Sequence, residues 1–267
     1  MTVTTSSSSS ARSAAAAEGR RRSPLAQLTR IELLLFWRER VGPVWGVGFP
    51  MLLLVIFGAI PSFRDVLPKS GGLTVLDTYI PILVIMSVAL LCMVSLPVTI
   101  VNYRERGVLR RLRTTPAGPM RVLGAQFVVN FGMAVITVVL IVVVARLAYG
   151  VPFPRQFGAW VISALFVSLA LLGMGLFIAA VGPTARAAGA IGNLVFYPMM
   201  FFGGLWLPIP VMPPVLQHIS HATPLGAGWE SFQQAALGHW PPMLALVAMA
   251  AWAVASGAAA IRFFRWE

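Results

Sequence analysis

Three histidines, His218, His221 and His239, lie in one stretch of the C-terminal third of the chain. Imidazole can bind zinc or carry protons, and two histidines three residues apart share one face of a helix. A zinc site needs further ligands, and no acid or cysteine stands near this pair to complete one. No Ser/His/Asp set or helix-borne metal motif is legible elsewhere. The sequence therefore predicts no catalytic residue and no metal site, and the histidines are interpreted as structural.

Nucleotide-binding chemistry is also missing from the sequence. The only lysine, Lys69, lies outside any glycine-rich phosphate-binding loop. Glu105 is the one acid between Asp77 and Glu230, so the apolar runs lack the buried carboxylates that proton-coupled carriers use. The sole cysteine, Cys92, lies inside an apolar run and is interpreted as packing. We predict a chain that is not an enzyme and binds no cofactor, so that its energy comes from elsewhere.

The composition predicts an integral membrane protein. Of the 267 residues, 58% are hydrophobic and 10% are charged, and the mean hydropathy is +0.83. One water-soluble core cannot bury so much apolar surface. The formal charge of +12 would suit nucleic-acid binding, but the basic residues form short clusters between long uncharged stretches. We therefore predict an all-α membrane protein that binds no nucleic acid.

Apolar runs and basic residues together predict the topology. Each run has about the 20 residues that a helix needs to cross the hydrocarbon core. Sixteen of the 20 basic residues fall on one side of the predicted membrane and four on the other, and the richer side faces the cytoplasm. Both termini are then cytoplasmic, in a multi-pass protein of the inner (plasma) membrane. The six predicted spans are 44–60, 79–101, 122–145, 158–181, 189–207 and 241–261.

Three further segments complete the predicted architecture. Residues 1–24, a Ser/Ala tract with an arginine cluster, are predicted to form a disordered cytoplasmic tail. Residues 25–40 have apolar residues at helical spacing with charges between them, which predicts an amphipathic interfacial helix. Between the fifth and sixth spans, a stretch containing Pro213, Pro224 and Glu230 is too apolar for a solvated loop and too short to span. It is interpreted as an external re-entrant hairpin, with an external loop lying on the membrane surface as the alternative.

Mildly polar and small residues occur inside the predicted spans. The pairs Ser95/Thr99 and Gln126/Asn130 each share one helix face. We expect them to hydrogen-bond between helices, with a substrate path as the alternative. Small-residue spacings such as Ala188/Gly192 would allow helices to approach closely.

The connection from position 102 to 116 combines charge, an apolar edge and a stop signal. It reads Asn-Tyr-Arg-Glu-Arg-Gly-Val-Leu-Arg-Arg-Leu-Arg-Thr-Thr-Pro. Val108, Leu109 and Leu112 would share one edge of a short helix that ends at Thr-Pro. Such a compact knob is able to dock into the groove of a partner, which a loop that only sets topology would not require.

This connection resembles the segment between the second and third helices of bacterial ABC-2 type transporter permeases. That segment typically reads Arg-Glu-x-Gly-x-Leu-x-x-Leu-x-x-Thr-Pro. A second match runs through Pro198, 202–208, 212–213 and 223–225. The resemblance covers roughly residues 25–265, as one transmembrane domain, and is closest to daunorubicin-resistance-type drug permeases. It implies that coupling to an ATPase uses Arg104, Glu105, Arg106, Gly107, Val108, Leu109, Leu112, Thr115 and Pro116.

The resemblance also implies partners and a function. Two permease chains would pack as a homodimer around a central path, each seated on a separate ATPase that binds ATP and Mg. The function would be ATP-driven export of a hydrophobic drug-like or lipid-like substrate, giving multidrug efflux and antibiotic resistance. Lipid-linked polysaccharide export, a membrane-embedded enzyme and a non-transporting membrane partner remain alternatives. Residues that would line the path, with packing as the alternative, are Asn193, Phe196, Tyr197, Met199 and Met200.

Overall fold

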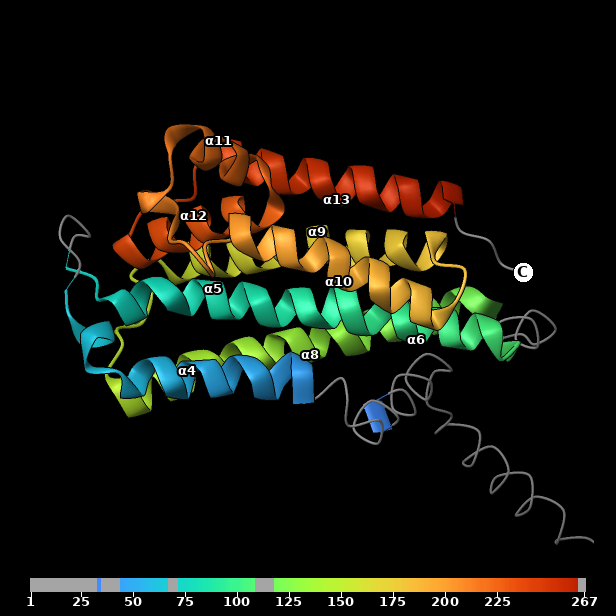
Figure 1. The fold of residues 1–267 in the computed structure, drawn as a ribbon, viewed down its shortest axis with the longest axis horizontal. Coiled ribbons are helices and arrows are strands. Elements are labelled where there is room, and N and C mark those ends of the chain that lie inside the picture. Colours follow the sequence, from blue (N-terminus) through green and yellow to red (C-terminus); the bar gives the residue numbers. More distant parts are fainter. Residues whose placement is uncertain (1–32, 35–43, 67–71, 109–117, 264–267) are drawn as a thin grey trace, which may run out of the picture.

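The computed structural model describes residues 33–34, 44–66, 72–108 and 118–263. Every regular element named in these ranges is helical (Figure 1). The elements, in chain order, are η1 (Val44–Gly48), α4 (Phe49–Ala59), η2 (Pro61–Arg64), α5 (Val75–Ala89), η3 (Leu90–Ser95), α6 (Leu96–Glu105), α8 (Gly118–Tyr149), α9 (Phe157–Val181), α10 (Ala185–Phe202), η4 (Ile209–Val211), α11 (Pro214–Ala222), α12 (Pro224–Leu237) and α13 (Met243–Phe263).

Four helices of the described chain are long and apolar enough to cross a bilayer. They overlap the second, third, fourth and sixth predicted spans and run over Val75–Glu105, Gly124–Tyr149, Phe157–Val181 and Met243–Phe263. The first predicted span corresponds to a shorter apolar helix, Val44–Ala59. The fifth, predicted over 189–207, corresponds to α10, which ends at Phe202 because the backbone turns at Gly203 and Gly204. The all-helical class is confirmed, whereas the count of six spans stays a prediction.

The helix from Val75 to Glu105 is the most buried of these four. It begins with a capping box, in which Thr74 Oγ1 accepts a hydrogen bond from Asp77 N at 3.1 Å and the Asp77 carboxylate accepts one from Thr74 N at 2.8 Å. Its middle is a π-helical segment, η3, which joins α5 to α6. An inserted residue of this kind widens the turn and shifts the register of the side chains that follow.

The α11–α12 hairpin packs into the molecule. Its second helix, α12, buries Leu225, Trp229 and Phe232 against its neighbours α9, α5 and α13. Trp229 Nε1 and Gln233 Nε2 both donate hydrogen bonds to the carbonyl oxygen of Thr78 at 3.4 Å. This burial makes α12 part of the core, where neighbouring helices replace water as the partners of its apolar side chains.

The two ends of the bundle differ. The C-terminal ends of α6 and α13 lie at the same end as the connection between α9 and α10, whereas the α11–α12 hairpin lies toward the end where α5 begins (Figure 1). The predicted tail (1–24) lies outside the described residues, as does the predicted interfacial helix (25–40) apart from Leu33 and Leu34.

Thr99 and Asn130 differ from one expectation about the polar residues of the spans. Hydrogen bonds between helices were predicted for the Ser95/Thr99 and Gln126/Asn130 pairs. The hydroxyl of Thr99 instead donates to Ser95 O at 3.1 Å, and the amide of Asn130 donates to Gln126 O at 2.8 Å. Thr137 and Ser163 make the same four-residue bond within their own helices. A short polar side chain reaches the carbonyl one turn back more easily than a partner on another helix.

Candidate functional site

The C-terminal end of α6 carries the first part of the predicted coupling segment. Gly107 has a φ of +68°, the left-handed conformation that ends helices, and its N–H donates to Arg104 O at 3.0 Å. Arg104 is half-buried, whereas Glu105 and Arg106 are exposed. The described chain continues to Val108. The remaining predicted coupling residues, Leu109, Leu112, Thr115 and Pro116, lie outside the described residues.

Arg104 holds the C-terminal end of α9. Its guanidinium donates to Ala179 O at 3.4 Å and also to Gly182 O. The last carbonyls of a helix have no partner within the helix and carry its negative dipole end, so a cation is favoured there. The arginine thus satisfies two backbone acceptors that would otherwise require water.

Glu105 holds the N-terminal end of α10. Its carboxylate accepts a hydrogen bond from Ala185 N at 3.2 Å, the first residue of that helix. Thr184 Oγ1 accepts a second free N–H, that of Ala187, at 3.1 Å. A carboxylate is favoured at the positive end of the dipole for the same reason that an arginine is favoured at the negative end.

Arg104 and Glu105 therefore form a two-residue clamp, with opposite charges on opposite helix ends, that ties α6 to the α9–α10 connection. The sequence motif predicted that these residues act together. The partners of the clamp, about 75 to 80 residues away in the chain, could not be read from spacing. In this structure the Glu105 carboxylate binds α10 of its own chain. The role of the segment in binding an ATPase stays a prediction.

The π-helical segment η3, which precedes α6, also contacts α9 and α10. A Cβ added to Gly175 of α9 or to Gly192 of α10 would come within 3.0 Å of the carbonyl oxygen of Cys92 or Met93, closer than real Cβ atoms come. Both helices thus touch the backbone of η3 directly, and only glycine allows this approach. The second predicted span is consequently held to α9 and α10 at two levels, by the clamp and by η3.

The predicted path residues do not share one surface. Phe196, Met199 and Met200 are buried within the chain, and the amide of Asn193 donates to Gly189 O at 3.0 Å. Tyr197 is 57% exposed, so it is the one of the five that points clearly out of the chain. Phe196, Met199 and Met200 pack inside the chain, and a role for the five residues in a path stays a prediction.

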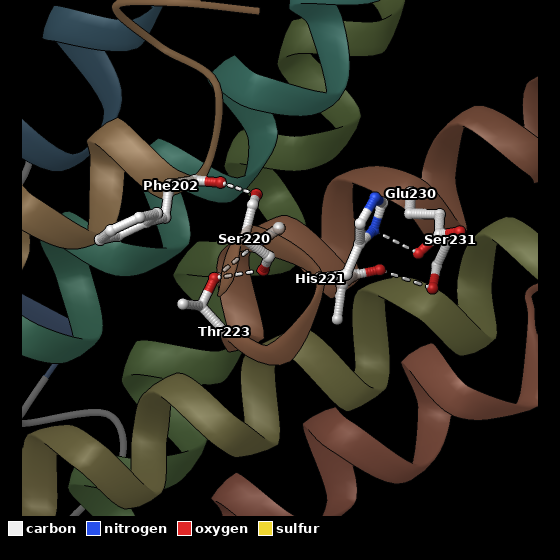
Figure 2. A network of polar contacts seen from close by, with 8 residues as sticks. Phe202, Ser220, His221, Thr223, Glu230 and Ser231 are labelled. Atoms are coloured by element: carbon white, nitrogen blue, oxygen red, sulfur yellow. Dashed lines mark hydrogen bonds and ion pairs between the residues drawn. The ribbon is translucent and has the colours of Figure 1, made fainter. Parts of the chain in front are cut away.

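The hairpin contains a polar network that connects α10, α11 and α12 (Figure 2). The hydroxyl of Ser220 donates to Phe202 O, and Thr223 Oγ1 donates to Ser220 O at 2.8 Å while accepting from Gly226 N at 3.1 Å. Pro213 and Pro224 stand at the starts of α11 and α12, where the missing N–H of proline costs nothing. Hydrogen bonds of the Ser220 and Thr223 side chains thus stabilise the turn that joins α11 to α12.

A close contact between a histidine and a carboxylate lies within the same hairpin and corrects the sequence analysis. His221 Nδ1 on α11 lies 2.7 Å from a carboxylate oxygen of Glu230 on α12, both side chains being partly exposed (Figure 2). The histidine was expected to have no nearby acid, but the hairpin brings these two residues together across the turn. Among the residues that the structure describes, no group of three or more His, Cys, Asp or Glu side chains could hold a metal ion.

Trp252 was not singled out from the sequence, although it anchors the hairpin. Its Nε1 donates to Ala222 O at 2.9 Å, the last residue of α11. Trp252 lies nine residues after the start of α13, about 13 Å along that helix. The tip of the hairpin therefore lies deep beside α13. The sequence indicated this anchor only by a tryptophan in the middle of an apolar run, because an indole N–H kept away from water needs an acceptor.

The long apolar helices, among them the buried helix Val75–Glu105, and the packed α11–α12 hairpin are typical of a membrane-embedded helical protein. The chain belongs to the ABC-2 type transporter family, whose family model matches residues 24–237. A Bacillus subtilis (strain 168) protein named "Putative transport permease YvfS" is 26% identical over 177 residues. That alignment covers 64% of this chain and 71% of the Bacillus protein. The chain is thus a membrane component of a transporter.

Proposed function

We propose that this chain is the permease subunit of an ATP-driven exporter that moves a hydrophobic drug-like or lipid-like substrate out of the cell. The energy comes from a separate ATPase that binds ATP and Mg, and two permease chains form a homodimer. The observation that carries this proposal is the Arg104–Glu105 clamp. A movement imposed on the segment that follows α6 would pull directly on the ends of α9 and α10. A coupling element requires such a connection, whereas a loop that only sets topology does not.

The proposed topology has six spans, cytoplasmic termini and an external re-entrant hairpin. The 18 residues of α10 are about 27 Å long, close to the thickness of the hydrocarbon core. The bond between Trp252 and Ala222 supports re-entry, because a loop on the membrane surface would not reach this far along α13. The bias of basic residues supports the orientation in the inner membrane.

Cysteine labelling in a Cys92→Ala background tests this topology. A cysteine at Thr115 should be shielded from an impermeant thiol reagent in intact cells, because this connection carries most of the basic residues between spans. A cysteine at Ser70, on the opposite side, should react. The matched control is the same pair of variants in permeabilised cells, where both should react. Labelling of Thr115 but not of Ser70 in intact cells would reverse the orientation.

Drug efflux tests the proposed activity. Cells that express the chain together with the ATPase that co-purifies with it should accumulate less daunorubicin, or another fluorescent hydrophobic drug, than cells expressing either chain alone. The difference should disappear when the catalytic residue of the ATPase is changed. Efflux by this chain without any ATPase would contradict the proposed division of labour. ATPase-dependent movement of a lipid-linked sugar instead of any drug would favour the polysaccharide alternative.

A further inference from the structure

A pocket of about 130 Å³ lies between α5, α8, α9 and α12, where α5 and α9 begin and α8 and α12 end. This is the end of the bundle opposite the Arg104–Glu105 clamp (Figure 1). Its inner wall is apolar and includes Ile80, Val142, Trp160 and Phe232. The rings of Trp160 and Phe232 lie 5.0 Å apart and fix one side of the pocket. The volume is on the order of four water molecules, enough for a small polar group with apolar surroundings.

Two arginines border this pocket. Arg146, in the last turn of α8, uses one guanidinium nitrogen to donate to Gly150 O and Val151 O, both at 3.3 Å, and lies 5.9 Å from the Phe153 ring centroid. Arg155, before α9, is exposed and has no hydrogen bond or ion pair with any residue in the described ranges. A guanidinium has five donors, so both side chains keep several free.

Neither arginine forms an ion pair within the described part of the chain. Asp77 is the acid that lines the pocket, and its carboxylate is occupied by the capping box at the start of α5. Glu230 lies elsewhere, beside His221 in the hairpin. The pocket therefore combines an apolar wall with two arginines and one carboxylate, so its lining carries a net positive charge.

Arg146 and Arg155 lie on the side of the predicted membrane where basic residues are scarce. Arg64, on the same side, is used within the chain, because it donates to Gly58 O at 2.8 and 3.1 Å and stacks on Tyr149. Arg146 and Arg155 instead present their free donors to one pocket at the ends of the spans. That level in a bilayer is the level of the lipid headgroups.

We propose that this pocket binds the headgroup of an anionic phospholipid. The phosphate would lie between Arg146 and Arg155, since guanidinium groups bind phosphate oxygens in pairs and more strongly beside apolar walls. The first carbons of the lipid lie against the apolar wall, and its acyl chains extend into the surrounding bilayer. Selectivity follows from net charge, because a choline headgroup would bring a third cation to the site. The inference goes beyond export, since it requires only that the helices cross a bilayer.

Competitive lipid binding tests this site. The delipidated full-length chain in detergent is incubated with equal amounts of dioleoyl phosphatidylglycerol and dioleoyl phosphatidylcholine, and retained lipid is counted by native mass spectrometry. The wild type should retain phosphatidylglycerol about tenfold over phosphatidylcholine, which is the effect of one or two charge-assisted hydrogen bonds. Arg155→Gln should bring the ratio close to one. Its thermal unfolding without lipid should match the wild type, because the described residues give Arg155 no partner to lose.

Arg262→Gln is the matched control, because it removes the same charge from an exposed position on α13, at the other end of the bundle. It should keep the wild-type ratio. Excess inorganic phosphate should leave the lipid bound, because it lacks the apolar part that the pocket wall contacts. The proposal is overturned if the wild type shows no preference or if Arg155→Gln keeps it. It is also overturned if phosphate alone displaces the lipid, which would assign the arginines to a free anion.

Discussion

Gly175→Ala and Gly192→Ala should each remove most of the folded protein from the membrane. The new Cβ would meet the carbonyl oxygen of Cys92 or Met93, which belongs to a backbone and cannot rotate away. Overpacking against movable side chains costs about 1–3 kcal/mol, and here whole helices must shift instead. We expect destabilisation of at least about 3 kcal/mol. Size-exclusion chromatography and thermal unfolding of the detergent-solubilised variants measure it.

Gly132→Ala is the matched control for these variants. Gly132 lies within α8, and a Cβ there would meet nothing within 4 Å. Alanine favours a helix by about 1 kcal/mol over glycine, so this variant should be as stable as the wild type or more so. If Gly175→Ala and Gly192→Ala unfold at the same temperature as Gly132→Ala, then α9 and α10 do not rest on η3 as described.

Glu105→Ala should uncouple the ATPase from transport without releasing it. The carboxylate binds α10 of its own chain, so its loss should leave the surface that meets a partner intact. A lost cap of this kind costs about 1 kcal/mol of stability, so the protein should stay folded while transport falls. Arg104→Ala should act in the same direction, because it frees the end of α9. Co-purification of the ATPase and efflux at matched expression measure the two effects separately.

Two further variants distinguish a loss of coupling from a loss of ATPase binding. Arg186→Ala removes an exposed charge beside the same connection and should change neither property. Leu109→Ala should release the ATPase, because the sequence places this side chain on the apolar edge of the knob. If Glu105→Ala releases the ATPase as Leu109→Ala does, the carboxylate contacts the partner, and the clamp is not the coupling element.

Much of the fold could be predicted from the sequence because a bilayer imposes length and polarity on each span. The four longest helices overlap runs that hydropathy predicts. The helical hairpin between α10 and α13 was also recognisable, since Pro213 and Pro224 mark the starts of its helices. These features depend on neighbours in the sequence, so local patterns were sufficient.

Contacts between distant segments could not be predicted in this way. The spacing Ala188/Gly192 indicated close packing, but nothing in the sequence indicated that η3 would be the surface contacted. His221 and Glu230 are nine residues apart, and only the turn at Thr223 brings them together. The bonds from Arg104 to the end of α9 join residues 75 and 78 positions apart in the chain. Each of these contacts depends on how helices pair, which single-sequence periodicity does not determine.

ATP hydrolysis in a reconstituted complex tests the central claim most directly. The chain and the ATPase that co-purifies with it are placed in lipid vesicles, separately and together. The account predicts no hydrolysis by this chain alone, slow hydrolysis by the ATPase alone and a rate several-fold higher for the complex. With Glu105→Ala the ATPase should stay bound while this stimulation is lost. Hydrolysis by this chain alone, or a complex whose rate equals that of the free ATPase, would contradict the account.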